Sequence, residues 1–231
     1  MTKELVRTAI RGGVAVGLSL TLYGCGRGAI SATQSQGVTE AQQSNIVITD
    51  SQPGVTPFIA NVQLSGQSIS QITSLTFTVA PMPNSASQAV NLTWSRAALL
   101  RLGYLKSYQI NLPVYGLYAG YQNQVTFQFA FGDGSIQQLQ YQIATAPYTD
   151  PTGIYTNPTI IKARASGSTL GYNFFILKSL LGSPVIVDTD GQVRWVGPQV
   201  TGSESVYFGN GQFVSGSQSS SSITSIRLDG I

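Results

Sequence analysis

Residues 124–144 read QVTFQFAFGDGSIQQLQYQIA, and the order of residue types in this stretch indicates an antiparallel β-hairpin. Apolar and polar side chains alternate through Val125-Thr126-Phe127-Gln128-Phe129, which is the period of a strand with one buried face. Gly132-Asp133-Gly134-Ser135 follow as a turn, because glycine accepts the positive φ that a tight hairpin needs. We therefore predict two paired strands, Gln124–Phe131 and Ile136–Ala144.

The same alternation recurs in short segments between turn residues from residue 45 onwards. It predicts further strands at Asn45–Thr49, Phe58–Leu64, Leu75–Ala80, Val90–Trp94 and Ser107–Leu112. Roughly seven strands in about 100 residues are typical of a two-sheet sandwich of immunoglobulin or fibronectin type III kind, which we place at residues 45–146. One helix is predicted at Ser95–Leu102, with Ser95 as its N-cap and Gly103 as its end.

Aromatic residues are frequent in the second half of this domain. Five tyrosines lie close together, at Tyr104, Tyr108, Tyr115, Tyr118 and Tyr121. A carbohydrate or phenol platform is one use of such a cluster, but packing at strands and corners is the commoner use and is our prediction. Trp94, at a strand end, is likewise predicted to belong to the core.

The pattern changes after residue 146. Residues 147–168 contain three prolines in turn-forming sequences and are interpreted as a linker. Residues 169–231 return to short strands, with predicted hairpin turns at Asp188-Thr189-Asp190-Gly191 and Gly209-Asn210-Gly211. A strand followed by Asp-Gly occurs twice, ending at Gly191 and Gly230, and this spacing of roughly 40 residues is close to one β-propeller blade.

These segments give an all-β fold class: an N-terminal immunoglobulin/fibronectin-like β-sandwich, followed by the first blade of a truncated β-propeller. One blade cannot bury both its faces or close a ring, and its edge strands would stay unpaired. We therefore expect residues 169–231 to be a partial β-propeller, and the chain to be the front of a longer protein. A complete all-β lipoprotein ending at Ile231 is the alternative.

The N-terminus predicts export. Residues 1–24 are interpreted as a signal peptide, because Lys3, Arg7 and Arg11 precede an uncharged apolar run shorter than the ~20 residues that span a bilayer. Leu22-Tyr23-Gly24-Cys25 resembles the bacterial lipobox, so Cys25 is the predicted lipid attachment site; an incidental Cys at an ordinary cleavage site is the alternative.

The expected location follows from this leader. Residues 25–44 are small and polar, and are interpreted as a flexible, lipid-anchored tether. We expect an exported protein on a membrane facing the periplasm or the cell surface. Gly26, rather than an aspartate, after the cysteine favours the outer membrane.

Composition excludes several kinds of chemistry. Charged residues are only 9%, and the chain has one Cys and no His. A Ser-His-Asp triad, a Cys-His pair, a His-ligated metal and an intrachain disulfide are therefore excluded within these residues. The net charge of +3 comes largely from the leader, so nucleic acid is not an expected partner. Asp188-Thr189-Asp190-Gly191 begins like a calcium loop, but the later ligands are missing. We predict no metal, no cofactor and no catalytic residue.

Two segments carry a resemblance to a known family. Residues 112–121 (LPVYGLYAGY) resemble the segment of bacterial aryl-sulfate sulfotransferases that closes their N-terminal β-domain, and residues 184–195 (PVIVDTDGQVRW) resemble the start of their propeller. The resemblance implies a periplasmic enzyme with a sandwich and a propeller. It implies transfer of a sulfuryl group from a phenolic sulfate ester to a phenol acceptor, through a transient sulfohistidine and without a nucleotide donor.

The family's catalytic histidine and its helpers lie on later blades, and this chain has no histidine to match them. Arg164, Arg194 and Arg227 do not align with a sulfate clamp, and each is expected to be an exposed blade or linker residue. The hypothesis is therefore the N-terminal part of an exported lipoprotein resembling aryl-sulfate sulfotransferase, inactive by itself. The sandwich would pack against the propeller or a second subunit, so a homodimer is a candidate assembly. The alternative is a non-catalytic surface lipoprotein whose sandwich and propeller bind a ligand or partner.

Overall fold

The computed structural model describes residues 45–156, 158–165, 167–168, 170, 172–179, 182–197, 203–209, 212–217 and 221–229. The predicted signal peptide (residues 1–24), Cys25 and the rest of the tether to residue 44 lie outside these residues. Within the described ranges, none of the helices combines the length and the hydropathy that a membrane span requires.

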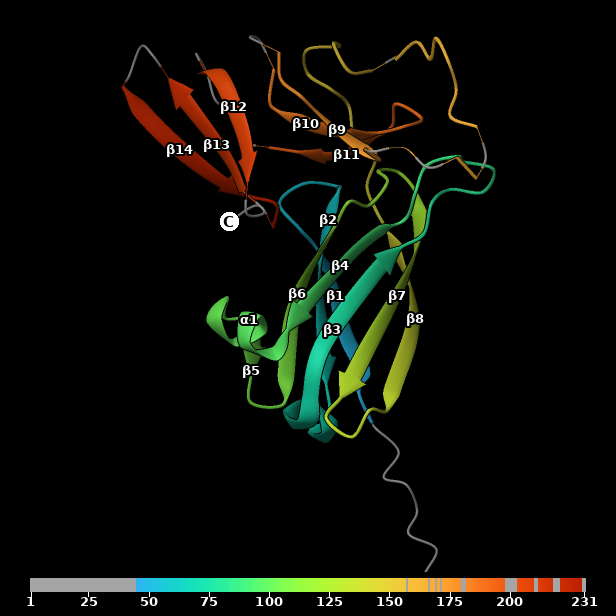
Figure 1. Cartoon of the computed structure of the whole chain (residues 1–231), viewed down its shortest axis with the longest axis vertical. Coiled ribbons are helices and arrows are strands. Elements are labelled where there is room, and N and C mark those ends of the chain that lie inside the picture. Colours follow the sequence, from blue (N-terminus) through green and yellow to red (C-terminus); the bar gives the residue numbers. More distant parts are fainter. Residues whose placement is uncertain are drawn as a thin grey trace, which may run out of the picture. The chain divides into compact units, whose positions relative to one another are not determined.

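The N-terminal body contains two four-stranded antiparallel sheets (Figure 1). The first sheet has the order β1-β2-β6-β5, with bounds Val47–Pro53, Ile59–Ser65, Gln109–Tyr115 and Leu105–Lys106. The second has the order β4-β3-β7-β8, with bounds Val90–Ser95, Ile72–Val79, Gln122–Phe131 and Ile136–Ala144. The predicted two-sheet sandwich is confirmed.

The core lies between the two sheets and is built by the alternation that the sequence shows. On β7, Val125, Phe127 and Phe129 are buried, whereas the side chains between them are partly exposed. Their inward-facing partners come from both sheets, and include Leu75, Phe77, Val79, Val62, Leu64, Ile110, Leu112 and Val114. Each such side chain contributes about 1.5–3 kcal/mol when it is fully buried, so this alternation decides which face turns inward.

Two predicted local structures are confirmed. Helix α1 (Arg96–Arg101) begins after Ser95, whose Oγ accepts a hydrogen bond from the Ala98 N–H at 3.2 Å. Gly103 follows with φ of 76°, a left-handed conformation that ends the helix. The turn between β7 and β8 is closed by the Phe131 N–H, which donates to the Ser135 carbonyl at 3.0 Å. A short 3₁₀ helix, η1 (Gln67–Gln71), joins β2 to β3.

Two three-stranded antiparallel sheets follow the sandwich. One has the order β11-β10-β9, with bounds Val193–Val196, Val185–Asp188 and Phe174–Leu177. The other has the order β12-β13-β14, with bounds Ser203–Gly209, Gln212–Ser217 and Ser222–Arg227. The all-β class is thereby confirmed. These sheets are compatible with propeller blades, but the propeller and the linker boundaries at residues 147 and 168 stay predictions.

Candidate functional site

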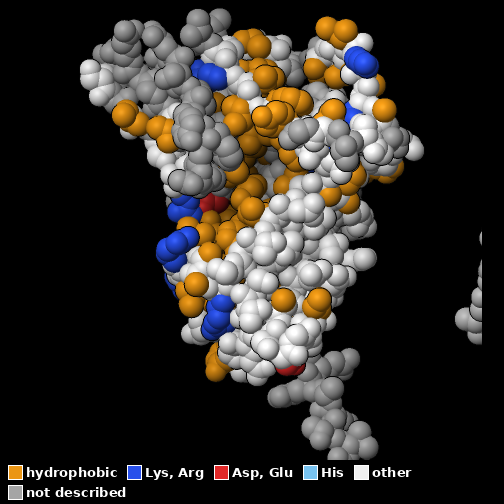
Figure 2. Space-filling view, viewed as in Figure 1, with side chains coloured by type: hydrophobic (Ala, Val, Ile, Leu, Met, Phe, Trp, Pro, Cys, Tyr) orange, Lys and Arg blue, Asp and Glu red, His pale blue; other side chains and the backbone are white. Residues whose placement is uncertain are grey.

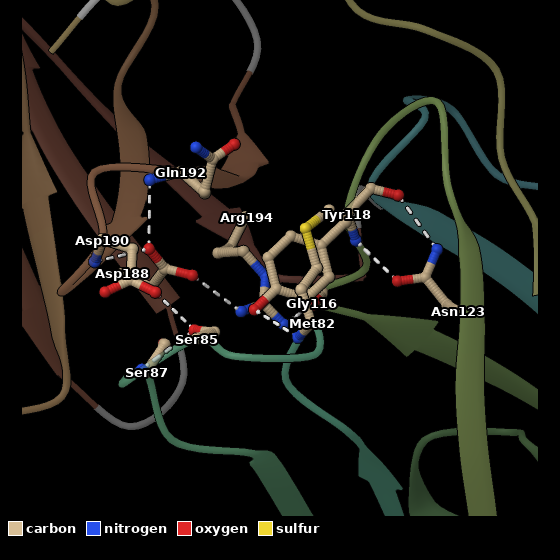
Figure 3. Close-up of polar contacts among 10 residues, drawn as sticks. All are labelled: Met82, Ser85, Ser87, Gly116, Tyr118, Asn123, Asp188, Asp190, Gln192 and Arg194. Carbon is tan, nitrogen blue, oxygen red and sulfur yellow. Dashed lines mark hydrogen bonds and ion pairs between the residues drawn. The ribbon is translucent and has the colours of Figure 1, made fainter. Parts of the chain in front are cut away.

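A buried polar cluster connects the β10–β11 hairpin to the sandwich (Figure 3). The hairpin turn is organised by Asp188, whose Oδ1 accepts hydrogen bonds from the Asp190 and Gln192 N–H groups, both at 3.0 Å. Gly191 has φ of 74° and donates its N–H to the Asp188 carbonyl. The predicted hairpin is confirmed, and one carboxylate oxygen of Asp188 is committed to the turn.

Arg194 on β11 occupies the centre of this cluster. Its side chain is 1% exposed, and its Nη1 pairs with Asp188 Oδ2 at 3.0 Å. Its Nε and Nη2 both donate to the carbonyl of Gly116, at 3.0 and 2.6 Å. The guanidinium carbon also lies 3.6 Å from the ring centroid of Tyr118, which gives a cation–π contact. A buried charge needs such partners, because desolvation without them costs several kcal/mol.

The expectation that Arg194 is an exposed residue is therefore wrong. Arginine is rarely buried without a counterion, and here Asp188 supplies one from the facing strand of the same hairpin. All three guanidinium nitrogens donate within the protein, and the side chain is shut off from solvent. Arg194 accordingly holds the hairpin against the sandwich and is unsuited to receive the oxygens of a sulfate.

The sandwich side of the cluster is a tight turn that Asn123 organises. Asn123, at the start of β7, is fully buried, and its Oδ1 accepts from the Tyr118 N–H at 2.8 Å. Its Nδ2 donates to the carbonyls of Tyr118 and Tyr121, at 2.9 and 3.2 Å. The side chain thus supplies the hydrogen bonds that the backbone N–H and C=O groups of this turn would otherwise lack. By fixing the backbone of Tyr118, it positions the Tyr118 ring against Arg194.

Tyr118 confirms the packing role predicted for the tyrosines. It is 2% exposed, and its hydroxyl accepts the Met82 N–H at 3.4 Å. Burial raises the pKa of Tyr118, and the positive charge of Arg194 offsets this only in part. The Tyr118 hydroxyl therefore stays protonated, and the ring presents an uncharged face to the guanidinium. Tyr115 packs against the core in the same way, whereas Tyr108 is exposed.

A loop between β3 and β4 completes the cluster. Ser85 donates its hydroxyl to the carboxylate of Asp190, and its Oγ accepts the Ser87 N–H at 3.0 Å.

Across the part of the chain that the structure describes, no three His, Cys, Asp or Glu side chains form a group that could hold a metal ion.

A second cluster lies at a separate place, between α1 and the end of β14. Arg227 donates to the hydroxyl of Tyr104 at 2.8 Å and pairs with Asp229. Burial, together with the hydrogen bond to Asp229, raises the pKa of Tyr104 to about 12. These residues line a hollow of about 460 Å³ with Trp94, which is 8% exposed and belongs to the core as predicted.

The three arginines noted in the sequence do not converge. Arg194 is buried at the hairpin, and Arg227 is half-buried beside Tyr104. Arg164 is half-buried as well, and bonds to the Asn173 side chain and the Ser168 carbonyl, both at 2.7 Å. Each guanidinium is held by a different set of partners, so the described residues do not bring these cations together around one ligand.

Comparison with known families identifies the sandwich. Residues 47–146 match the family model of the arylsulfotransferase Ig-like domain. The sandwich is similar to the arylsulfotransferase Ig-like domain. This confirms the resemblance carried by residues 112–121, which lie within the match, whereas residues 184–195 lie beyond it and the propeller start they imply stays a prediction. A search of curated proteins found no match to this chain.

The matched sandwich supplies most of the buried cluster (Figure 3). Gly116, Tyr118 and Asn123 all lie within the matched residues, and Arg194 and Asp188 come from the segment that follows. Gly116 has φ of 79°, and a Cβ at this position would meet the side chain of Val90 at 2.9 Å. Arg194 therefore donates to the backbone carbonyl of a residue that has to be glycine. The local sequence pattern does not show that this carbonyl accepts hydrogen bonds from Arg194.

Proposed function

We propose that this chain is the N-terminal part of a lipid-anchored protein of the aryl-sulfate sulfotransferase type. The match of residues 47–146 to the arylsulfotransferase Ig-like domain is the observation that carries the proposal. In this role the chain directs export and anchors the protein to a membrane. Its sandwich also packs against the first strands of a catalytic propeller and stabilises their position. The buried hydrogen bonds from Arg194 to the carbonyl of Gly116 support this proposed packing.

The proposed reaction needs groups that these residues do not provide. A histidine would attack the sulfur of a phenolic sulfate ester, forming an S–N bond while the S–O bond to the phenol breaks; a second phenol would then take the sulfuryl group from the histidine. Positive charges are required around the sulfuryl oxygens. The chain has no histidine, and Arg194 is fully engaged. The nucleophile would therefore come from polypeptide outside these 231 residues.

Sulfuryl transfer can be measured directly with 4-nitrophenyl sulfate as donor and phenol as acceptor. The 231-residue chain alone should release 4-nitrophenolate no faster than buffer. The complete product of its gene should release it and form phenyl sulfate. Turnover by the 231 residues alone would contradict the proposal that the nucleophile lies outside these residues. A complete product without turnover would instead favour the alternative of a non-catalytic surface lipoprotein.

We also propose that Cys25 carries the lipid anchor and, with Gly26 after it, directs the protein to the outer membrane. Acyl chains contribute ~0.8 kcal/mol per buried CH₂, so two or more chains anchor a protein stably. Cys25→Ser should therefore move the protein from the membrane pellet to the soluble fraction, as measured by fractionation and immunoblotting. Ser35→Ala in the tether is the control and should stay in the pellet. A Cys25→Ser protein that remains in the pellet would show that Cys25 is not the anchor.

A further inference from the structure

A small cavity opens where the chain leaves the sandwich. Its volume is about 240 Å³, and it is lined by the sandwich, by the β10–β11 turn and by residues 147–156, which follow the sandwich. On the face that Figure 2 shows, hydrophobic side chains gather where the sandwich meets the three-stranded sheets, and Lys and Arg side chains lie mostly at the margins. Among the described residues that line the cavity, none is Lys or Arg.

Aromatic rings form the walls of this cavity. The ring centroids of Phe58 and Tyr148 are 5.1 Å apart and their planes meet at 65°, so the two rings form adjoining walls and do not stack. Tyr155 lines the cavity as well, and its hydroxyl accepts the Ser179 N–H at 2.9 Å. Both tyrosines pack against the buried cluster that contains Phe58. The rings are therefore held at steep angles around a small space, as in an aromatic cage.

One charged side chain, Asp150, lines the same cavity. It is only 9% exposed. The other buried carboxylates of the described residues, Asp188 and Asp229, each pair with an arginine. In the part of the chain that the structure describes, Asp150 pairs with no Lys or Arg. Because a buried charge is costly without an opposite charge, Asp150 gives the cavity a negative charge that a cation would neutralise.

The carboxylate of Asp150 stays ionised at neutral pH. Burial alone would raise the pKa of Asp150, but the hydrogen bonds from Tyr155 and Thr152 outweigh burial and lower it. The pKa of Tyr148 is raised, first by burial and then by the negative charge of Asp150. The charge is therefore present under ordinary conditions, and it lies within electrostatic range of the Tyr148 ring.

The hydrogen bonds of Asp150 limit the kind of cation that fits. Its Oδ1 accepts the N–H and the hydroxyl of Thr152, at 3.0 and 2.9 Å, and its Oδ2 accepts the Tyr155 N–H at 2.8 Å. A calcium ion needs six or more oxygen ligands, and a primary ammonium has three N–H groups that need acceptors. A quaternary ammonium has no N–H group and is bound by charge and by aromatic faces.

We propose that this cavity binds a quaternary ammonium group, with Asp150 as the opposite charge and with Phe58, Tyr148 and Tyr155 as walls of the cage. Asp150 and both tyrosines lie after the residues that match the arylsulfotransferase model. The inference therefore goes beyond the proposed function and does not depend on sulfuryl transfer. The trimethylammonium group of choline, free or in a lipid headgroup, has the chemistry that the cavity recognises.

The test is isothermal titration calorimetry with choline chloride, on the 231-residue chain carrying Cys25→Ser so that the protein stays in solution. Choline should bind saturably at one site per chain. The uncharged analogue 3,3-dimethylbutanol should bind at least about tenfold more weakly, because it has the shape of choline without its charge. Equal binding of the two compounds, or no saturable binding of choline, would overturn the proposal.

Two positions test the charge and the ring separately. Asp150→Asn keeps an oxygen for the turn but removes the charge, and it should raise the dissociation constant for choline at least about tenfold. Tyr148→Leu should raise this constant at least about fivefold, whereas Tyr148→Phe, which keeps the ring, should bind as the unsubstituted protein does. Undiminished binding by Asp150→Asn, or binding by Tyr148→Phe that is as weak as that of Tyr148→Leu, would contradict the cage.

Asp133→Asn is the matched control. Asp133 Oδ1 also accepts the N–H and the hydroxyl of the residue two positions later, Ser135, at 2.9 and 2.6 Å, but Asp133 is exposed and does not line the cavity. Asp133→Asn should bind choline as the unsubstituted protein does. If it weakens binding as much as Asp150→Asn, the effect belongs to general charge and the site is wrong.

Cosedimentation with phosphatidylcholine vesicles distinguishes the two sources of the ligand. Vesicle binding that free choline competes away would identify a lipid headgroup, and choline binding without vesicle binding would identify a free cation. Vesicle binding by a protein that does not bind choline would place the contact on another surface and overturn the proposal.

Discussion

Replacing Arg194 by methionine should lower the free energy of opening the β10–β11 hairpin by about 3–5 kcal/mol, the usual cost of removing one partner from a buried ion pair. Methionine keeps the unbranched stem but removes the charge that neutralises Asp188, which is 2% exposed. It also leaves the carbonyl of Gly116 without the two hydrogen bonds that Arg194 donates. The loss therefore combines an unpaired carboxylate with an unsatisfied backbone acceptor.

Native-state hydrogen exchange measures this effect at the site itself. The amides of β10 and β11 should exchange faster in the variant by a factor that reflects the lost free energy, while amides in β3 and β7 stay protected by the sandwich core. Arg164→Met is the matched control, since Arg164 is half-buried and hydrogen-bonded but has no buried counterion among the contacts that the structure describes. Equal exchange rates in the Arg194→Met variant and the original protein would contradict the role given to Arg194.

A double variant separates the charge from the packing. Asp188→Asn removes the negative charge while its side-chain oxygen still accepts the turn N–H groups of Asp190 and Gln192. Arg194→Met with Asp188→Asn should therefore recover at least half of the stability lost in the single variant, because a neutral buried pair carries no uncompensated charge. If the double variant is as unstable as Arg194→Met alone, the lost hydrogen bonds to Gly116 dominate instead.

The sandwich could be predicted from sequence because its strands alternate over several residues. Leu75–Val79 and Val125–Phe129 show the two-residue period without interruption, and Ser95 and Gly103 mark the helix by cap chemistry that acts locally. The alternation does not predict strand β5, because its two residues are too short to show a period. It is defined by pairing with β6, and pairing of this kind is visible only in the folded chain.

The buried cluster could be predicted only in part. Asp188 and Arg194 flank a recognisable turn, so their closeness follows from the hairpin. Their burial does not follow from it, because the group that covers Arg194 is the Gly116 carbonyl, 78 positions earlier in the chain. A sequence pattern reports local periods and turns, whereas this contact depends on how the hairpin meets the sandwich. The general tendency of arginine to be exposed therefore gave the wrong expectation.

Replacing Asn123 by alanine should destabilise the Ig-like domain by about 2–4 kcal/mol, because truncation leaves several buried backbone groups without partners. Asn123 is fully buried and bonds to the N–H and the carbonyl of Tyr118 and to the carbonyl of Tyr121. Alanine supplies none of these bonds, and the backbone groups that lose them lie at a buried position. The variant should unfold at a lower urea concentration with an unchanged slope.

The Asn123→Ala change should also weaken the packing of Arg194. Asn123 stabilises the turn that contains Tyr118, and the Tyr118 ring contacts Arg194. The Tyr118 ring lies 3.6 Å from the guanidinium carbon, and loosening its backbone weakens that contact. Hydrogen exchange of the Tyr118 and Gly120 amides should accelerate, and exchange in β11 should follow. Gln122→Ala, at the exposed neighbouring position on β7, should change stability by less than about 0.5 kcal/mol. If Asn123→Ala destabilises the sandwich but leaves β11 exchange unchanged, the turn and the hairpin are not coupled through Tyr118.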